Sequence, residues 1–379
     1  MAITITESMI NRVIYSTLIE KIGKGKSIIL IGPRQVGKTT LIKSILEGQD
    51  YLFLDGDDPT TRNLLTSPNT EELKSILGNY KLVFIDEAQR IEGIGVTLKI
   101  ITDQFKSVQL FVSGSSAFEL NNQTSEPLTG RKWEYKLYPI SWEELENSLG
   151  YVKAEQQLEL RLLYGMYPDV INNLGDEVEV LNQLVNSYLY KDILAFGGIR
   201  KPDILEKLLR ALALQLGSEV SYNELSRLIG VNKGTIESYI DLLCKGYVIF
   251  KLSSFSRNLR NEIRTNQKIY FYDTGVRNAL IGNFSALDSR ADTGAIWENF
   301  LISERLKNLS YSKPIVSQYF WRTKQQQEID YVEESSGKIV GYEFKWNPKA
   351  KIKIHKSFVE AYDSEIKVIN RSNFRELIV

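Results

Sequence analysis

Two glycines, a lysine and a threonine stand at the spacing of a phosphate-binding loop within residues 27–40, SIILIGPRQVGKTT. Gly32 and Gly37 permit backbone angles that a side chain would forbid, so that successive N–H groups can turn inward around a phosphate. Lys38 would contact the outer two phosphates, and the Thr39 hydroxyl would hold a magnesium ion. An apolar strand pattern precedes the loop and a helical pattern follows it, as such a loop requires. The predicted nucleotide-binding residues are Gly32, Pro33, Arg34, Gln35, Val36, Gly37, Lys38, Thr39 and Thr40.

A second apolar run, LVFIDEAQ at 82–89, ends in two carboxylates. A carboxylate at the end of a neighbouring strand can hold magnesium through water, and this is the role predicted for Asp86. The next acid, Glu87, would orient or deprotonate the attacking water. The alternative is that both acids simply end a strand at the surface.

A third run, VQLFVSGSS at 108–116, ends in a polar cluster. Ser113 or Ser115 would contact the terminal phosphate or the water, or else cap the following turn. Arginine stabilises the charge that develops on a transferring phosphoryl group, either within a subunit or from a neighbouring one. Arg131 is therefore a candidate catalytic residue or a salt-bridge partner, and Arg34 has the same two alternatives.

The elements that position these residues follow from the hydrophobic pattern. Short apolar runs alternate with helical patterns, which predicts a parallel sheet between helices. The runs are SIILI (27–31), YLFL (51–54), LVFI (82–85), VQLFV (108–112) and WEYKLY (133–138).

The remainder of the chain changes pattern twice. Leucines at three-to-four spacing predict helices over 141–216. Residues 217–256 contain a capping box at Ser221, a turn at Gly230, a second helix and a strand, an order typical of a winged helix. We therefore predict an α/β protein made of four parts: a P-loop domain (1–140), a helical segment (141–216), a winged-helix-like module (217–256) and a smaller α/β domain (257–379).

Charged residues of unusual placement occur near the C-terminus. The alternating stretches EIDYV and IVGYEFK flank SSG, which predicts a hairpin that turns at Ser336 and Gly337. In that register Asp330 faces Glu343, and Lys345 lies on the same face as Glu343. Like charges opposite each other destabilise a sheet unless a cation lies between them. A divalent metal would supply that cation.

Several phrases of the sequence resemble the AAA-type ATP-binding proteins of bacteria and archaea, in the branch that carries a long uncharacterised C-terminal region. The first are GPRQVGKTTL, LVFIDEAQ, the SGSS strand end and LTGRKWEYKLYPIS, and further ones are GMYPDV, SYLYKDIL, TIESYIDLL, KIYFYDTGV and IWENFLISE. The resemblance implies an ASCE-type ATPase domain that binds ATP and Mg²⁺. It implies Asp86 near the metal, Glu87 as catalytic base, and Ser113 or Ser115 as sensor. It does not imply a partner or a pathway.

A second resemblance covers about residues 294–367. Glu298 in a helix-like stretch, then Asp330, then Glu343 with Lys345 resemble the PD-(D/E)xK nuclease superfamily. This resemblance implies carboxylates that bind magnesium and a lysine that positions water. The family's proline before the aspartate is replaced by Ile329. The alternative is a retained scaffold with solvated charges or a Lys345 salt bridge.

Composition limits the remaining choices. In 379 residues, 43% hydrophobic content describes an ordinary globular protein, and 47 basic residues balance 47 acidic ones. No overall field therefore attracts nucleic acid or membrane, and any such patch must be local. From Arg257 onward, 20 Lys and Arg against 15 Asp and Glu give about +5, which includes Lys349, Lys351 and Lys353. A solvated edge strand explains those three lysines equally well.

The sequence also predicts the setting of the protein. The single Cys244 indicates an inert thiol and a reducing compartment. No apolar stretch reaches the length of a membrane span or a signal peptide, so we predict a cytoplasmic protein without membrane contact. The predicted function is Mg²⁺-dependent ATP hydrolysis, coupled to a C-terminal domain that contacts DNA or a protein partner; a homo-oligomer is left open. The alternatives are a nucleotide-controlled binding switch with little turnover and an ATP-regulated, metal-dependent nuclease.

Overall fold

The structure is a computed structural model, and it describes residues 10–114, 128–186, 201–256, 267–350 and 355–379. The described residues form two compact units. One consists of the residues up to Ile140 together with Lys245–Tyr247, and the other contains the rest. Ser115, Lys351 and Lys353 lie outside the described residues.

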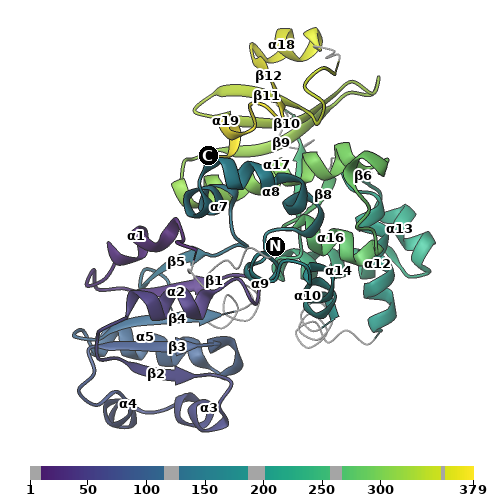
Figure 1. Cartoon of the computed structure of the whole chain (residues 1–379). Helices are drawn as coiled ribbons and strands as arrows, with labels where there is room; N and C mark the ends of the chain where they lie inside the picture. Colours follow the sequence, from purple (N-terminus) through teal and green to yellow (C-terminus); the bar gives the residue numbers. More distant parts are fainter. Residues whose placement is uncertain (1–9, 115–127, 187–200, 257–266, 351–354) are drawn as a thin grey trace. The chain divides into compact units, whose positions relative to one another are not determined.

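The first unit is built on a parallel sheet with the strand order β2-β3-β4-β1-β5 (Figure 1). The five predicted apolar runs are its strands, so the predicted α/β fold class is confirmed. The strands are β1 (Ser27–Ile31), β2 (Leu52–Asp55), β3 (Leu82–Asp86), β4 (Gln109–Gly114) and β5 (Lys132–Lys136). The order places β4 between β1 and β3, which brings the carboxyl ends of these three strands together.

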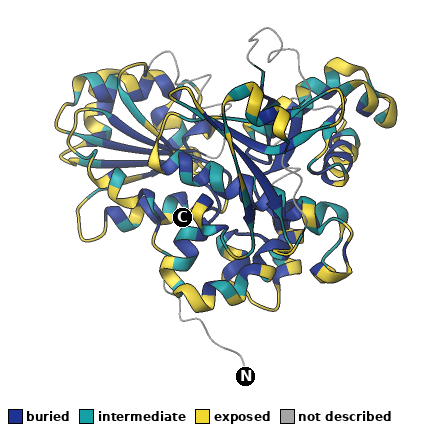
Figure 2. Cartoon of the chain, turned by 90° about the horizontal axis from the view of Figure 1, so that it is seen from above, coloured by how far each residue is buried: buried dark blue, intermediate teal, exposed yellow. Residues whose placement is uncertain are grey.

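Helices pack against this sheet and bury its inner strands (Figure 2). They are α1 (Ile14–Ile19), α2 (Lys38–Ile45), α3 (Pro59–Leu65), α4 (Thr70–Leu77), η1 (Ala88–Arg90) and α5 (Ile94–Gln104). One core joins the strands to apolar residues of α3, α4 and α5. Local signals start two of these helices: Asp58 caps α3 ahead of Pro59, and Asn69 forms a capping box with Glu72 at α4.

The second unit begins with the predicted helical segment. Its helices are α7 (Trp142–Leu149), α8 (Tyr151–Tyr164), α9 (Pro168–Asn172), α10 (Glu177–Leu184), α12 (Pro202–Leu214), α13 (Tyr222–Ile229), α14 (Lys233–Lys245), α16 (Thr274–Ile281), η3 (Leu287–Ser289), α17 (Thr293–Ser312), α18 (Lys356–Tyr362) and α19 (Arg375–Ile378). In the part of the chain that the structure describes, no helix is long and apolar enough to cross a membrane.

A mixed sheet runs through the second unit, with the order β12-β11-β10-β9-β7-β8-β6. Its strands are β6 (Glu219–Val220), β7 (Ile249–Ser254), β8 (Gln267–Phe271), β9 (Ser317–Arg322), β10 (Glu328–Ser335), β11 (Lys338–Lys345) and β12 (Glu365–Asn370). The antiparallel pair β10 and β11 turns at Ser336 and Gly337, as predicted, and pairs Tyr331 with Tyr342. If the same register is continued by one residue beyond the Tyr331–Tyr342 pair, Asp330 lies opposite Glu343.

Strand β6, helices α13 and α14, and strands β7 and β8 follow one another along the chain. Gly230 ends α13 in the left-handed conformation, and Ser221 accepts a hydrogen bond from the Glu224 N–H at its start. Strand β8 pairs antiparallel with both β6 and β7. Strand β6, helices α13 and α14 and strand β7 are the elements of the predicted winged-helix-like module (217–256), whose identity stays a prediction, whereas β8 lies beyond its predicted end.

Two of the phrases that carry the family resemblance, GMYPDV and KIYFYDTGV, pack against each other. Asp273 caps α16 and also accepts a hydrogen bond from the Met166 N–H at 2.6 Å. Gly165 has φ +76°, and a Cβ there would lie 2.1 Å from Asp273 Oδ1. A Cβ at Gly275 would lie 2.1 Å from the Tyr164 carbonyl oxygen. The end of α8 and the start of α16 therefore fit together closely at these two glycines.

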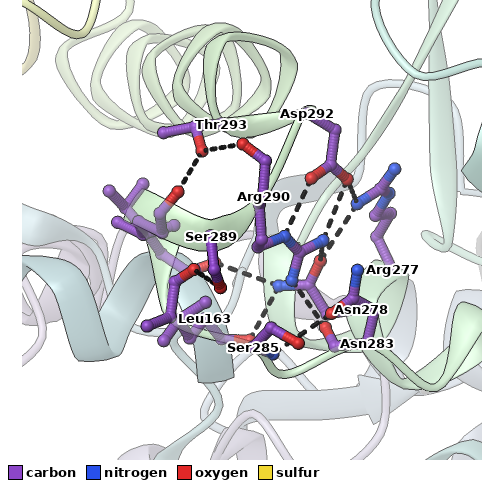
Figure 3. A network of polar contacts seen from close by, with 12 residues as sticks. Leu163, Arg277, Asn278, Asn283, Ser285, Ser289, Arg290, Asp292 and Thr293 are labelled. Carbon is purple, nitrogen blue, oxygen red and sulfur yellow. Dashed lines mark hydrogen bonds and ion pairs between the residues drawn. The ribbon is translucent and has the colours of Figure 1, made fainter.

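A polar network joins α16 to the start of α17 (Figure 3). Arg277 donates to Asp292 Oδ2 at 2.5 Å, and Arg290 donates to both oxygens of the same carboxylate. Asn278 accepts from both arginines and donates to the Leu163 carbonyl of α8. The side chains of Arg277 and Arg290 are buried, so one carboxylate compensates two buried cations.

Candidate nucleotide-binding site

The predicted phosphate-binding loop follows β1, which is buried along its whole length. Gly37 has φ 89° and stands directly before α2, which begins at Lys38. At Gly32 a Cβ would lie 2.0 Å from the Leu137 carbonyl oxygen, so no side chain fits there. The loop is thus closed by two glycines that the backbone requires, at the amino end of a helix.

Lys38 is 4% exposed and its ammonium lies inside the loop. The ammonium donates to the carbonyl oxygens of Gly32 at 3.0 Å and Pro33 at 2.7 Å. The two carbonyl oxygens hold the Lys38 ammonium inside the loop. In a complex with a nucleotide, phosphate oxygens would replace these carbonyls as hydrogen-bond acceptors. Around it, Val36 is buried, Arg34 is half-buried, and Gln35 and Thr40 are exposed.

Three polar residues from the three predicted runs meet beside the loop. The Thr39 hydroxyl donates to Asp86 Oδ2 at 2.7 Å, and the Ser113 hydroxyl donates to Asp86 Oδ1. Asp86 is 6% exposed and Ser113 is fully buried. The adjacency of β1, β4 and β3 produces this meeting, because Asp86 and Ser113 lie at the carboxyl ends of their strands and the loop after β1 leads to Thr39 at the start of α2.

Glu87 stands one residue beyond β3 in the left-handed conformation, with φ 46°. Its N–H donates to Asp86 Oδ1 at 3.1 Å and to Ser113 Oγ at 3.3 Å, which fixes the backbone turn. Its carboxylate accepts a hydrogen bond from the amide of Gln89, a buried residue of η1. Sequence reasoning missed Gln89, although this residue stands within the LVFIDEAQ motif. Its amide side chain, two residues after the predicted base Glu87, was the signal that could have identified it.

Gly56, which follows β2, is a second residue that sequence reasoning missed. Its N–H donates to the Asp86 carbonyl at 2.9 Å. A Cβ at Gly56 would lie 2.5 Å from the Glu87 carbonyl oxygen and 2.9 Å from that of Asp86. The backbone of the acid pair therefore rests directly on this glycine. The available signal was its position just after the end of a parallel strand.

Arg12 supports the phosphate-binding loop through hydrogen bonds to backbone carbonyls. Its guanidinium donates to the Val36 carbonyl at 2.7 Å and to the Tyr138 carbonyl at 2.6 Å. The side chain is buried and lies 4.0 Å from where a Cβ of Gly37 would be. No motif surrounds Arg12 in the sequence, so only the folded chain reveals it.

Arg131 does not join these residues. Its Nε donates to both oxygens of Asp103, at 2.7 and 2.9 Å, as the salt-bridge alternative predicted. The backbone of Arg131 pairs with Ser27, the first residue of β1, whereas the loop follows the last residue of that strand. Five residues of strand separate them, about 16 Å at ~3.3 Å per residue. A contact with a nucleotide on the same chain does not fit this position, and a role on a neighbouring chain stays a prediction.

The residues of the second predicted cluster, which lies in the other unit, are also close together in the structure. Lys345 Nζ lies 3.1 Å from Glu343 Oε2 and 3.8 Å from Asp330 Oδ2. Glu298 accepts from Lys268 Nζ at 3.1 Å and from the Tyr270 hydroxyl. Burial raises the pKa of Glu298 to about 7, with Asp330 adding to the effect against the attraction of Lys268. Burial likewise raises the pKa of Glu343.

Lysines, rather than an arrangement of metal ligands, lie among these acids. Lys268 is fully buried, and its ammonium lies 2.6 Å from Glu328 as well as close to Glu298. Among the described residues no group of three or more Asp, Glu, His or Cys side chains is placed to hold a metal ion. The carboxylates in this arrangement therefore do not fit a resident metal. Sequence reasoning missed Lys268, because it lies on β8, far along the chain from the predicted hairpin.

Comparison with known families adds to this geometry. Residues 24–146 match a family described as an AAA domain, which confirms the predicted kind of nucleotide-binding domain. Residues 155–287 and 293–376 match two domains of unknown function, DUF8612 and DUF4143. The match to DUF4143 names no nuclease, so the predicted PD-(D/E)xK resemblance is not confirmed.

Two curated relatives match along most of the chain. They are the uncharacterized proteins Mb2031c of Mycobacterium bovis and Rv2008c of Mycobacterium tuberculosis. Each is 30% identical over 323 residues, which cover 84% of this chain and 70% of the relative. Among solved structures, the Walker-type ATPase PABY2304 of Pyrococcus abyssi has a TM-score of 0.51 at 17% identity, covering 73% of this chain and 97% of that one. At this identity the likeness shows the fold.

Proposed function

We propose that this chain, which belongs to the same family as its two mycobacterial relatives, binds ATP with Mg²⁺ in the loop 32–40 and hydrolyses it. One observation carries the proposal: the hydroxyls of Thr39 and Ser113 both donate to the Asp86 carboxylate beside the loop. An AAA domain match over residues 24–146 supports it.

Each residue then has a defined task in hydrolysis. Backbone N–H groups of the loop and the amino end of α2 bind the phosphates, and the Lys38 ammonium exchanges its carbonyl partners for phosphate oxygens. The Glu87 carboxylate accepts the proton of the attacking water. Gln89 holds that carboxylate through its amide, and Ser113 orients the Glu87 backbone.

The oxygen donors beside the loop fit a magnesium ion. Thr39 Oγ1 and Asp86 Oδ2 are 2.7 Å apart, and hydroxyl and carboxylate oxygens are ligands that Mg²⁺ prefers. Thr39 would bind the ion directly and Asp86 would hold it through water, in place of their present hydrogen bond. The ion would supply neutralisation of charge on the phosphate oxygens.

The rate of turnover per bound ATP tests this proposal against the binding-switch alternative. When the protein is saturated with ATP and Mg²⁺, we expect it to release phosphate steadily at an ordinary enzymatic rate, on the order of 1 per second. Release should be measured together with bound nucleotide, in the presence and absence of nucleic acid. If ATP binds and fewer than about one in a hundred molecules is cleaved per minute under every condition, the chain is a switch.

For the C-terminal acidic cluster we propose a nuclease-like scaffold without cleavage activity, rather than a nuclease. Lys268 supports this proposal, because its ammonium already places a cation against Glu298 and Glu328, at a position where the nuclease resemblance implies no lysine. Strong attraction to Glu298 and Glu328 outweighs burial and raises the pKa of Lys268, so its charge persists at neutral pH. We expect no Mg²⁺- or Mn²⁺-dependent cleavage of plasmid or single-stranded DNA.

To test this, the wild-type protein and the Asp330→Ala variant are each incubated with both DNA substrates in Mg²⁺ or Mn²⁺, and cleavage is measured on gels. Metal-dependent cleavage that the wild-type chain shows and the Asp330→Ala variant lacks would instead establish the nuclease alternative. Equal traces of cleavage in both proteins would indicate a contaminating enzyme and leave the scaffold proposal supported.

Within the second unit, we propose the predicted subdivision at 216/217 and 256/257, with residues 217–256 as a winged-helix-like module. We also propose a cytoplasmic location. The single Cys244 supports it, because a chain with one cysteine forms no disulfide of its own, as is usual in a reducing compartment.

A further inference from the structure

Basic residues gather at the amino edge of the five-stranded sheet, the edge opposite the nucleotide site. Lys26 immediately precedes β1, Lys81 immediately precedes β3, and Lys106 stands in the loop before β4. Arg131 and Lys132 stand where β5 begins. In a parallel sheet all strands start at the same edge, so these loops are neighbours in space.

Backbone contacts confirm that the loops lie side by side. The Gln109 N–H donates to the Lys81 carbonyl at 2.8 Å, and the Gln109 side chain donates to the Lys26 carbonyl at 3.1 Å. The Ser27 N–H donates to the Arg131 carbonyl at 3.0 Å. The loops that carry the cations are therefore neighbours, with their backbones at the spacing of adjacent strands, about 4.8 Å.

Five lysines of these loops form no ion pair with a carboxylate among the described residues. Lys24, Lys81 and Lys106 are exposed, and Lys106 lies within electrostatic reach of Asp103. We call this set the basic edge: Lys21, Lys24, Lys26, Lys81 and Lys106.

Of the acids near the basic edge, Glu20 is exposed beside Lys21 and reduces the local charge, two others have partners of their own, and two lie at its margin. Asp103 is held by Arg131, and Glu134 is held by Lys132. The loop before β2 carries Glu47 and Asp50 instead of lysine, but β2 is the outermost strand. The concentration of positive charge is therefore local in a chain of zero net charge.

A cavity of about 110 Å³ opens within the basic edge. Lys26, Lys106, Ser107 and the two glycines Gly23 and Gly25 are among its lining residues. At ~30 Å³ per water molecule, it holds a few waters or one small anionic group.

Beside the cavity the Trp133 ring is contacted by two of these cations. Lys26 Nζ lies 4.3 Å and Lys21 Nζ 4.7 Å from the ring centroid. Cation–π contacts of this kind hold lysine heads in place without cancelling their charge. Lys26 is thereby fixed at the cavity while it remains available to an anion.

We propose that the basic edge binds the phosphate backbone of a nucleic acid, with one phosphate group seated in the cavity between Lys26 and Lys106. Cations distributed over several adjacent loops suit a linear polyanion better than a single small anion. Anionic membranes would need several apolar side chains beside the charges, and of the large apolar residues that the described chain exposes only Tyr80 in these loops and Ile19 at the end of α1 lie near them.

This inference goes beyond the proposed ATPase and does not depend on hydrolysis. The length of β1 separates the basic edge from the loop 32–40, so nucleic acid and ATP would bind at the same time.

Fluorescence anisotropy with labelled single-stranded DNA, duplex DNA and single-stranded RNA tests the proposal. The test variant is Lys24→Glu with Lys81→Glu, because both side chains are exposed and neither forms an ion pair with a described residue. The control is Lys74→Glu with Lys153→Glu, which makes the same change of charge at exposed lysines outside the basic edge. A fluorescent ATP analogue checks that the P-loop domain of each variant is folded.

At about 100 mM salt we expect the wild-type chain to bind at least one of the three nucleic acids, and the test variant to bind it at least about tenfold more weakly. The slope of log affinity against log salt should fall by about 2 in the test variant, one for each lost phosphate contact. The control should stay within about twofold of wild type.

Three results would overturn the proposal: no nucleic acid binds the wild-type chain, the test variant binds as the control does, or the wild-type chain binds vesicles of acidic lipid but not nucleic acid. A wild-type chain that binds nucleic acid and does not hydrolyse ATP would overturn the proposed function alone, so the two failures are distinguishable.

Discussion

Replacing Lys38 with alanine should abolish ATP binding, with a loss of affinity of about 100-fold or more. The ammonium is buried inside the loop, so its contacts with phosphate oxygens would be charge-assisted and shielded from water. Such contacts contribute about 1.5–3 kcal/mol each, and two of them amount to two or more factors of ten. Isothermal titration with ATP and Mg²⁺ measures the affinity directly.

The matched control for this prediction is Glu87→Gln. It should bind ATP within about threefold of wild type and lose at least ~100-fold in turnover, because the amide does not accept the proton of water. Thermal unfolding of all three proteins checks that they are folded. Tight ATP binding by the Lys38→Ala variant, or full turnover by Glu87→Gln, would show that the phosphates and the water lie elsewhere.

Replacing Asp292 with asparagine should lower the free energy of unfolding by about 3 kcal/mol or more. The carboxylate is the acid that both Arg277 and Arg290 contact, and removing one partner of a buried ion pair leaves uncompensated charge at a cost of about 3–5 kcal/mol. Urea denaturation near pH 7 measures the difference. Asp288→Asn, at an exposed aspartate four residues earlier, should change the unfolding free energy by less than about 0.5 kcal/mol.

The contribution of Asp292 to the free energy of unfolding should decrease in acid. Hydrogen bonds from Arg290, then those from Arg277, hold the pKa of this carboxyl well below its ordinary value against the opposing effect of burial. Its contribution to stability is therefore complete above the unfolded-state pKa of about 3.9 and is lost as the pH falls through the folded value. The difference between wild type and Asp292→Asn should be constant from about pH 5 to 8 and shrink below about pH 4. A difference that grows in acid would contradict this assignment of the charge.

Much of the nucleotide site could be predicted because its parts are local in sequence. The loop 32–40 carries its own glycines, lysine and threonine, and the acids follow directly on an apolar strand. The C-terminal hairpin was predictable for the same reason: two alternating stretches around Ser336 and Gly337 fix which residues face each other. In each case the deciding interaction spans only a few residues.

The missing parts lie far away along the chain. Lys268 reaches Glu298 and Glu328 across 30 and 60 residues, so the sequence suggested a metal where the structure has a lysine. Arg12 and Gly56 support the loop and the acid pair from other segments, and neither carries a motif. Such contacts depend on strand order and on the docking of loops, which hydrophobic periodicity does not specify.

By itself the sequence determined that this protein has a phosphate-binding loop, an acid pair and a parallel sheet, because glycine positions, charge and alternation are properties of short segments. Only the tertiary structure decided which groups complete them. The order β2-β3-β4-β1-β5 brings Thr39, Asp86 and Ser113 into one network. The parallel direction of β5 places Arg131, just before its first residue, at the opposite edge. The same order gathers lysines from separate loops into the basic edge, since the start of every parallel strand meets at one side of the sheet.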